Sequence, residues 1–493
     1  MTGYEWDFPP LRHSLGTRAT FSPLTCLIAA HPLDRATERA RIASGSLVDG
    51  LGGNVAYYHE LFHWVQFQAS TLGQFLLTLR HARDQLVYQS ALEDPAFRDT
   101  LFDPKRKSPV IAYETAGEPD PRFSCSTHER LDRYRDVEVV RRLFYRPHMV
   151  GYELYPFAVA VERALEHVGA LEQESGYGAG RPDRSFRVTT GEAVDFATST
   201  ESILELSALA MELLMHLTAR EIDIDLLQYV LNRIQDEIRE VRASALACVG
   251  GALLDELLKM AQSGDGTALY DTVTKIAIIC DVALNPPLPP VCEVADTIAL
   301  DDVLPTSRFA RLLAVAQLGG SGDEFHLSPD TVTRYRDRIA RDSGLTYAGP
   351  DPSHTTRPYP SLPDTKDLPR FHWLFLRATS ARFFALRREF PELLVFFGPL
   401  FSGYRSEQFT DAIELNDEKW FLPPAFEAPD GIKPCAAVET AKAFIQSLAA
   451  DFSMNDFVAR PELLSLPHFP KSARAELIGA VQDWVTRLRV HCG

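Results

Sequence analysis

The sequence predicts a mainly helical α+β fold, and three observations favour this fold class. Apolar residues recur at helical spacing over long stretches, above all in 55–89 and 198–262. Segments with the composition of strands are few and short. Hydrophobic residues make up 45% and charged residues 24% of the 493 residues, which is typical of a globular protein with room for two or three domains.

The first part of the chain predicts a strand followed by a long helical region. Residues 20–30 are rich in Thr, Phe, Leu and Ile and predict a strand, which Pro23 would confine to a sheet edge. The glycines of 45–53 predict a loop, with Asn54 as the N-cap of the next helix. The stretch 55–89 has no proline and a single glycine, so it predicts one long helix or two abutting helices.

The middle of the chain predicts loops between helices. Residues 103–136 are polar and contain proline, which predicts mostly loop with a strand at 110–113. Helical spacing returns in 153–171, and 186–190 predicts a short strand. The strongly helical stretch 198–262 predicts about three helices.

A proline cluster at 285–290 predicts a domain boundary. It ends a predicted helix at 271–285 abruptly, because proline lacks the backbone N–H that a helix needs. We therefore expect a catalytic domain in 1–290 and a mainly helical domain of unassigned role in 291–493. Further helical patterns follow at 307–318, 328–343, 370–390, 437–452 and 471–489. The phenylalanines between Phe371 and Phe397 predict a helical core, or else a cover for a cleft or a surface for a protein partner.

Charge and cysteine content limit the partners and the compartment. The net charge of −17 argues against nucleic-acid binding, which needs clustered Lys and Arg. No apolar run approaches the length of a membrane span, so we expect no membrane association. The seven cysteines are scattered and form no Cys-x-x-Cys pair, which indicates a reducing compartment, by default the cytoplasm.

The motif His59-Glu60-x-x-His63 predicts a zinc site inside a helix. Residues four apart on a helix are separated by about 40° around its axis, so both imidazoles can bind one metal ion. Glu60 points away from that stripe, as suits a general base acting on water rather than a metal ligand. The alternative is a pair of hydrogen-bonded core histidines.

A catalytic zinc site needs a third protein ligand. The metzincin arrangement is excluded, because Ala69 stands where its third His would be and Gln66 where its Gly would be. In the apolar helical run 200–212, Glu205 and Glu212 lie within about 20° of each other. Buried carboxylates are costly unless they are paired or bind metal, although these two could instead mark the solvated edge of an amphipathic helix.

These residues together resemble the gluzincin branch of zinc metallopeptidases. In that branch, His-Glu-x-x-His is followed by a distant helical Glu, often within Glu-Gly-x-Ala. The chain has Glu205-Leu206-Ser207-Ala208, which matches the Glu and the Ala but not the Gly. The resemblance implies Glu205 as the third zinc ligand, a peptide or protein substrate, and a zincin-like domain with a small sheet packed on the His59-bearing helix. It covers only the two helices.

Other residues are weaker candidates. Glu212 suits an outer role, orienting one imidazole through its free ring nitrogen. Glu153 and Glu162 are the alternatives for the third ligand. Candidates for stabilising an oxyanion, each of which could equally be structural, are His128, His148, His167, Tyr57 and Tyr152. Gln66 and Gln68 are expected to line the far end of the motif helix.

The leading functional prediction is a zinc-dependent peptidase in which Glu60 is the general base. One alternative is a non-heme di-iron oxidase on a helical bundle, since Glu60-x-x-His63 is half of that signature. The second half is missing, because Glu212 and His216 are one residue too far apart. The other alternative is a binding or regulatory protein that keeps the motif only for structure.

Overall fold

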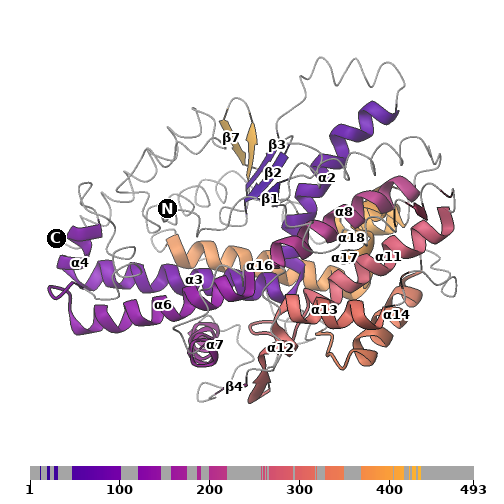
Figure 1. The fold of residues 1–493 in the computed structure, drawn as a ribbon. Coiled ribbons are helices and arrows are strands. Elements are labelled where there is room, and N and C mark those ends of the chain that lie inside the picture. Colours follow the sequence, from indigo (N-terminus) through magenta and orange to yellow (C-terminus); the bar gives the residue numbers. More distant parts are fainter. Residues whose placement is uncertain are drawn as a thin grey trace.

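The protein is mostly α-helical and carries two small sheets (Figure 1). The computed structural model describes residues 11–12, 19–22, 27–30, 47–101, 120–145, 157–174, 186–189, 199–218, 257, 259–260, 263, 266–292, 295–316, 318, 328–348, 368–402, 405–415, 421, 425–428 and 431–434. The mainly helical fold class is confirmed for these residues. The helices predicted at 437–452 and 471–489, and most of the second half of 198–262, lie outside them.

Two long helices lie end to end and carry the His-Glu-x-x-His motif. Helix α2 (Leu47–Ala69) and helix α3 (Thr71–Glu93) are separated by Ser70 alone, which confirms the prediction of two abutting helices. The Ser70 hydroxyl oxygen accepts a hydrogen bond from the Gly73 N–H at 3.0 Å and so caps α3.

The start of α2 differs from the sequence-based prediction. The helix already begins at Leu47, so the loop predicted for 45–53 is wrong from that residue onward, and Asn54 is not an N-cap. A glycine costs a helix only about 1 kcal/mol relative to alanine, which tertiary packing readily offsets. The contacts of α2 with other helices and with the sheet supply such packing.

Helix α6 (Cys125–Tyr145) corrects a second prediction. Residues 125–136 were expected to be loop, yet they form the first half of this helix. Most side chains of this half are polar and lie toward solvent, whereas Leu131 and Tyr134 are buried. So few apolar residues give little periodic signal, although the helix packs along α3. The strand predicted at 110–113 lies outside the described residues.

Helix α8 (Thr200–Thr218) lies at the centre of the helical part. It packs against α2, α11 (Gly266–Ala283) and α17 (Leu393–Ser402). The remaining described helices are α4 (Pro95–Leu101), α7 (Phe157–Glu174), α12 (Leu300–Val303), α13 (Pro305–Val315), α14 (Pro329–Asp342), α16 (Leu368–Glu389) and α18 (Ser406–Leu415). The helices predicted near 153–171, 271–285, 307–318, 328–343 and 370–390 are thus confirmed, with shifted ends.

A five-stranded sheet joins the two ends of the described chain and packs on α2. Its strands, in spatial order, are β1 (Leu11–Arg12), β2 (Ala19–Ser22), β3 (Leu27–Ala30), β6 (Ala425–Ala428) and β7 (Gly431–Pro434). The strand predicted at 20–30 is therefore two strands of an antiparallel pair. Strands β3 and β6 pair in parallel, and both β2 and β3 contact α2.

A second, two-stranded sheet consists of β4 (Arg187–Thr189) and β5 (Thr297–Ala299), which pair in parallel. Strand β4 confirms the short strand predicted at 186–190. Like β3 with β6, the pair joins segments from opposite sides of the proline cluster.

The proline-rich segment at 285–290 lies largely in the interior. The Asn285 side-chain oxygen accepts hydrogen bonds from the Thr71 N–H at 3.1 Å and from Arg387 Nη1 at 2.9 Å. The Ala348 N–H donates to the Asn285 carbonyl at 3.1 Å. One hydrophobic core contains side chains from both sides of this segment. The division into two domains at residue 290 remains a prediction, and these contacts cross the predicted boundary.

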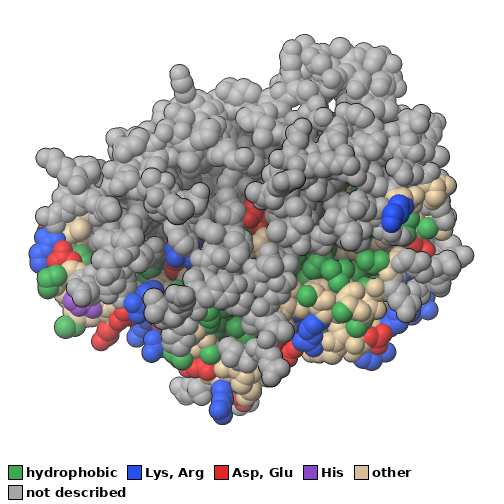
Figure 2. Space-filling view, in the orientation of Figure 1, with side chains coloured by type: hydrophobic (Ala, Val, Ile, Leu, Met, Phe, Trp, Pro, Cys, Tyr) green, Lys and Arg blue, Asp and Glu red, His purple; other side chains and the backbone are tan. Residues whose placement is uncertain are grey.

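The described residues on the face drawn in Figure 2 carry charges of both signs. Among the described residues visible there, basic and acidic side chains lie interspersed with apolar ones. None of the described helices combines the length and apolar character that a membrane crossing requires.

The last carbonyls of α2 are buried, and side chains from other helices satisfy them. The hydrogen bonds run from Gln74 Nε2 to Phe67 O at 3.0 Å, from Ser380 Oγ to Gln68 O at 2.9 Å, and from Arg387 Nη1 to Ala69 O. Helix α16 therefore caps the helix that carries the motif. Helix α3 can approach this end because Gly73 has no side chain: a Cβ there would lie 2.3 Å from the Phe67 carbonyl oxygen.

We expect Gly73→Ala to lower the free energy of unfolding by about 1–3 kcal/mol, as overpacking typically does. The added methyl group would meet rigid backbone rather than a movable side chain. Gly169→Ala is the matched control, because a Cβ at this position in α7 meets no heavy atom within 4 Å. It should stabilise the helix by about 0.5–1 kcal/mol. Chemical denaturation measures both, and a Gly73→Ala variant as stable as Gly169→Ala would contradict the close approach.

Candidate metal centre

Helix α2 places the two histidines of the motif on one face, toward α8. The Nε2 atoms of His59 and His63 lie 3.1 Å apart, and the ring centroids are 4.7 Å apart with the planes nearly perpendicular. The geometry follows from the four-residue spacing, which stacks the two side chains one helical turn apart.

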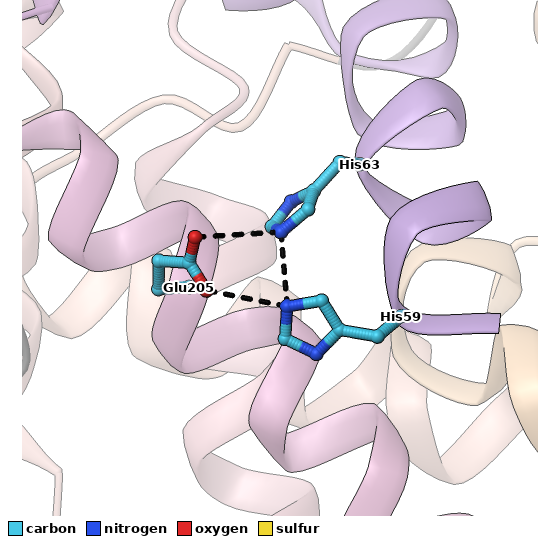
Figure 3. A group of neighbouring side chains, drawn as sticks. All are labelled: His59, His63 and Glu205. Carbon is cyan, nitrogen blue, oxygen red and sulfur yellow. Dashed lines mark hydrogen bonds and ion pairs between the residues drawn. The ribbon is translucent and has the colours of Figure 1, made fainter. Parts of the chain in front are cut away.

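Helix α8 brings Glu205 to the same point. Its Oε2 lies 3.2 Å from His59 Nε2, and its Oε1 lies 3.6 Å from His63 Nε2. Figure 3 shows both imidazoles turned toward this carboxylate on the neighbouring helix. Within the described part of the chain, these three residues are the one group of three or more His, Cys, Asp or Glu side chains that could hold a metal ion.

Hydrogen bonds to the outer ring nitrogens fix the tautomer of each histidine. The Nδ1–H of His59 donates to the Glu212 carboxylate, which accepts and cannot donate when ionised. The Gln66 amide donates from Nε2 to the Leu204 carbonyl at 3.2 Å, so its oxygen must face His63. That oxygen lies 2.8 Å from His63 Nδ1, which therefore carries the proton. Glu212 thus occupies the orienting position predicted for it.

When both imidazoles are neutral in these tautomers, each Nε2 atom directs a lone pair toward the Glu205 carboxylate, which is itself an acceptor. Three acceptors this close need a positive charge between them, supplied either by a proton on His59 Nε2 or by a metal ion. Zinc bonds of about 2.0–2.1 Å in a tetrahedral site place neighbouring ligand atoms about 3.3 Å apart. The three separations of 3.1, 3.2 and 3.6 Å bracket that value. The residues therefore fit a zinc ion.

The pKa values of the three candidate ligands are shifted by their burial and by one another's charges. Burial lowers the pKa of His59, but Glu212 and Glu205 outweigh it and raise this pKa well above its ordinary value. Burial raises the pKa of Glu205, but His63 and His59 overcome it and lower the pKa to about 2. Burial lowers the pKa of His63, only partly offset by Glu205. Without metal, a proton shared by His59 and Glu205 can occupy the centre.

Glu60 is a buried carboxylate close to the three candidate ligands. Neither of its oxygens has a hydrogen-bond partner of ordinary geometry. Burial raises its pKa well above the usual value, as do Glu205 and Glu212, while His59 and the backbone of Phe21 lower it. A buried carboxyl left without such partners costs stability, which is typical of a functional group rather than a structural one.

The centre is almost closed to solvent. His59, Glu60 and His63 are 0% exposed, and the Glu205 side chain is 9% exposed. Glu212 is also fully buried. The interpretation of Glu205 and Glu212 as a solvated helix edge is therefore wrong, because the apolar faces of α8 are covered by several helices.

The structure places the other sequence candidates away from this group or does not describe them. Glu162 accepts a hydrogen bond from the Val188 N–H at 2.7 Å and so ties α7 to β4. His128 contacts the Asp120 carbonyl. Burial lowers the pKa of His167 to about 4, together with the charge of Arg133. Glu153, His148, Tyr152 and the side chains of Tyr57 and His216 lie outside the described residues.

Two residues near the centre were not assigned a role from the sequence. The Phe21 ring of β2 stacks on His63, with centroids 6.2 Å apart, and it gave no sequence signal because the strand is distant along the chain. Gln66 was expected only to line the helix, but it holds the ring of His63. The spacing of three residues between His63 and Gln66, which puts them on one helix face, could have indicated this contact.

The aromatic segment after residue 370 belongs to the core, as one of its two interpretations predicted. Phe383, Phe384, Phe390, Phe396 and Phe397 are buried. The Phe397 ring stacks on Phe62 of α2, with centroids 5.5 Å apart. The segment thus supports the back of the helix that carries the candidate ligands.

Comparisons with protein-family models, with curated proteins and with solved structures found no match to this chain. The resemblance to gluzincins therefore rests on His59, Glu60, His63, Glu205 and Ala208, and it remains a prediction.

We expect His59→Ala, His63→Ala and Glu205→Ala each to remove most of the bound zinc, since a catalytic zinc site requires three protein ligands. Glu212→Ala removes an orienting hydrogen bond instead and should weaken zinc binding by about 10- to 100-fold. Elemental analysis of the purified variants after dialysis measures the zinc bound per chain.

Glu162→Ala is the control for this series, because Glu162 was the described alternative for the third ligand and bonds a strand instead. It should keep its zinc. Zinc retained by Glu205→Ala, or lost by Glu162→Ala with the fold intact, would refute the assignment of the third ligand.

Proposed function

We propose that this chain is a zinc-dependent hydrolase that cleaves peptide bonds, with Glu60 as the general base. The observation that carries the proposal is the convergence of His59, His63 and Glu205 beside the buried Glu60 carboxyl, whose oxygens lack a hydrogen-bond partner of ordinary geometry. His59, His63 and Glu205 would hold the ion. A zincin-like arrangement of the domain is part of the proposal, supported by the strands that pack on α2.

The side chains of the proposed centre have separate roles in hydrolysis. When bound, zinc supplies a Lewis acid that polarises a carbonyl group and makes a water molecule more acidic. Glu60 accepts a proton from the attacking water and delivers it to the departing nitrogen. A carboxylate whose pKa is raised by burial is a stronger base than an exposed one, which favours the first of these proton transfers. Glu212 and Gln66 keep the two imidazoles in the orientation that binding requires.

The choice of a peptide substrate rests on the resemblance to gluzincins. Strand β2 lies against α2, and the backbone of Phe21 is near the Glu60 carboxyl. A cytoplasmic location is the accompanying prediction from the cysteine pattern.

The di-iron alternative gains no support from the described residues. They contain the single group of potential ligands around Glu205, and the sequence has no second Glu-x-x-His near it. The metal content of the purified protein separates the two proposals directly: one zinc ion per chain, or two iron ions.

We expect Glu60→Gln to retain zinc and fold while lowering peptide hydrolysis by about 10²- to 10⁴-fold, because the amide cannot accept a proton. A library of quenched fluorescent peptides provides the assay, with zinc content measured on the same samples. Glu389→Gln makes the same chemical change at an exposed position of α16 and should leave the rate unchanged.

Two results would reject the proposal. One is a Glu60→Gln variant that cleaves the library as fast as the parent. The other is a parent protein with a full complement of zinc and no cleavage of any peptide in the library.

A further inference from the structure

Gln66 connects the two helices that supply the candidate ligands. It follows His63 by three residues on α2 and is buried. Its side-chain oxygen accepts a hydrogen bond from His63 Nδ1 at 2.8 Å, and its amide nitrogen donates to the Leu204 carbonyl of α8 at 3.2 Å. Leu204 directly precedes Glu205, so one amide group touches a ligand ring and the backbone beside another ligand.

We infer that Gln66 is a positioning residue that sets the tautomer of His63 and fixes the spacing between α2 and the turn of α8 that bears Glu205. The inference rests on the proposed zinc site and extends it. Glu212 bonds the ring of His59, whereas Gln66 bonds both the ring of His63 and the backbone beside Glu205.

The chemistry of the amide explains why a glutamine stands at this position. An amide has an acceptor and a donor at the same end of the side chain, so it can bond a ring N–H and a carbonyl together. A methionine of similar length has neither strong group. The amide is also neutral, and a further charge would be costly beside the buried carboxyl groups of Glu60, Glu205 and Glu212.

Gln68 offers a matched comparison. It lies two residues further along α2, is equally buried, and turns its side chain toward α3 rather than toward the candidate ligands. Its side-chain oxygen is 3.5 Å from Gln74 Nε2. Replacing either glutamine by methionine therefore removes a buried amide from the same helix, but only one of the two changes affects the metal centre.

The experiment measures the zinc dissociation constant of Gln66→Met and Gln68→Met by competition with chelators of graded strength. We expect Gln66→Met to bind zinc about 10- to 100-fold more weakly than the parent, the usual effect of losing an outer partner of a ligand. Gln68→Met should bind as the parent does. The unfolding of both metal-free variants is measured alongside, because a merely structural role would lower their stability without changing zinc affinity selectively.

A double-mutant cycle tests the link to α8. In a Glu205→Ala background, Gln66→Met should cost less zinc affinity than in the parent, because only its hydrogen bond to the remaining ligand His63 is then lost. In a Glu212→Ala background, which leaves Glu205 and His63 in place, the cost should persist.

Two outcomes would overturn the inference: an unchanged zinc affinity in Gln66→Met, or an equal cost of that substitution in all three backgrounds. A parent protein that binds no zinc would instead refute the proposed function, so the two failures are distinguishable.

Discussion

The buried end of helix α2 is the constraint on which the rest of the structure depends. A helix that stops inside a protein leaves carbonyl groups that must find donors away from water. The hydroxyl of Ser380 and the guanidinium of Arg387 supply two of them from α16. Arg387 also donates to Asn285, which in turn accepts the first N–H of α3. These hydrogen bonds thereby join four parts of the chain at one place: α2, α3, the proline-rich segment at 285–290 and α16.

These hydrogen bonds explain why residues far beyond the motif are needed to hold it. Helix α17 packs on α2 through the rings of Phe397 and Phe62, and it also approaches α8 closely at Gly398. A Cβ at Gly398 would lie 2.2 Å from the Met215 side chain, on the helix that supplies Glu205. Helix α17 thus contacts both helices of the metal centre, although more than 170 residues separate it from α8 and more than 320 from α2.

The sequence predicted the centre itself better than its surroundings, and the reason is physical. The relation between His59 and His63 is local, because helical geometry alone sets it. Glu205 and Glu212 could be singled out because buried carboxylates in an apolar helical run need a partner or a metal, and the resemblance to gluzincins selected Glu205. By contrast, the helix at 125–136 shows little apolar periodicity, and the hydrogen bond from Gln66 to α8 depends on how two helices pack. The stacking of Phe21 on His63 likewise joins segments that no local pattern relates.

The burial of the candidate ligands has a consequence for kinetics. His59, Glu60 and His63 are fully enclosed, and only the Glu205 carboxylate touches solvent. An ion held there would exchange past the Glu205 carboxylate or through local opening of the surrounding helices, so its residence time would depend on that opening as well as on the metal–ligand bonds.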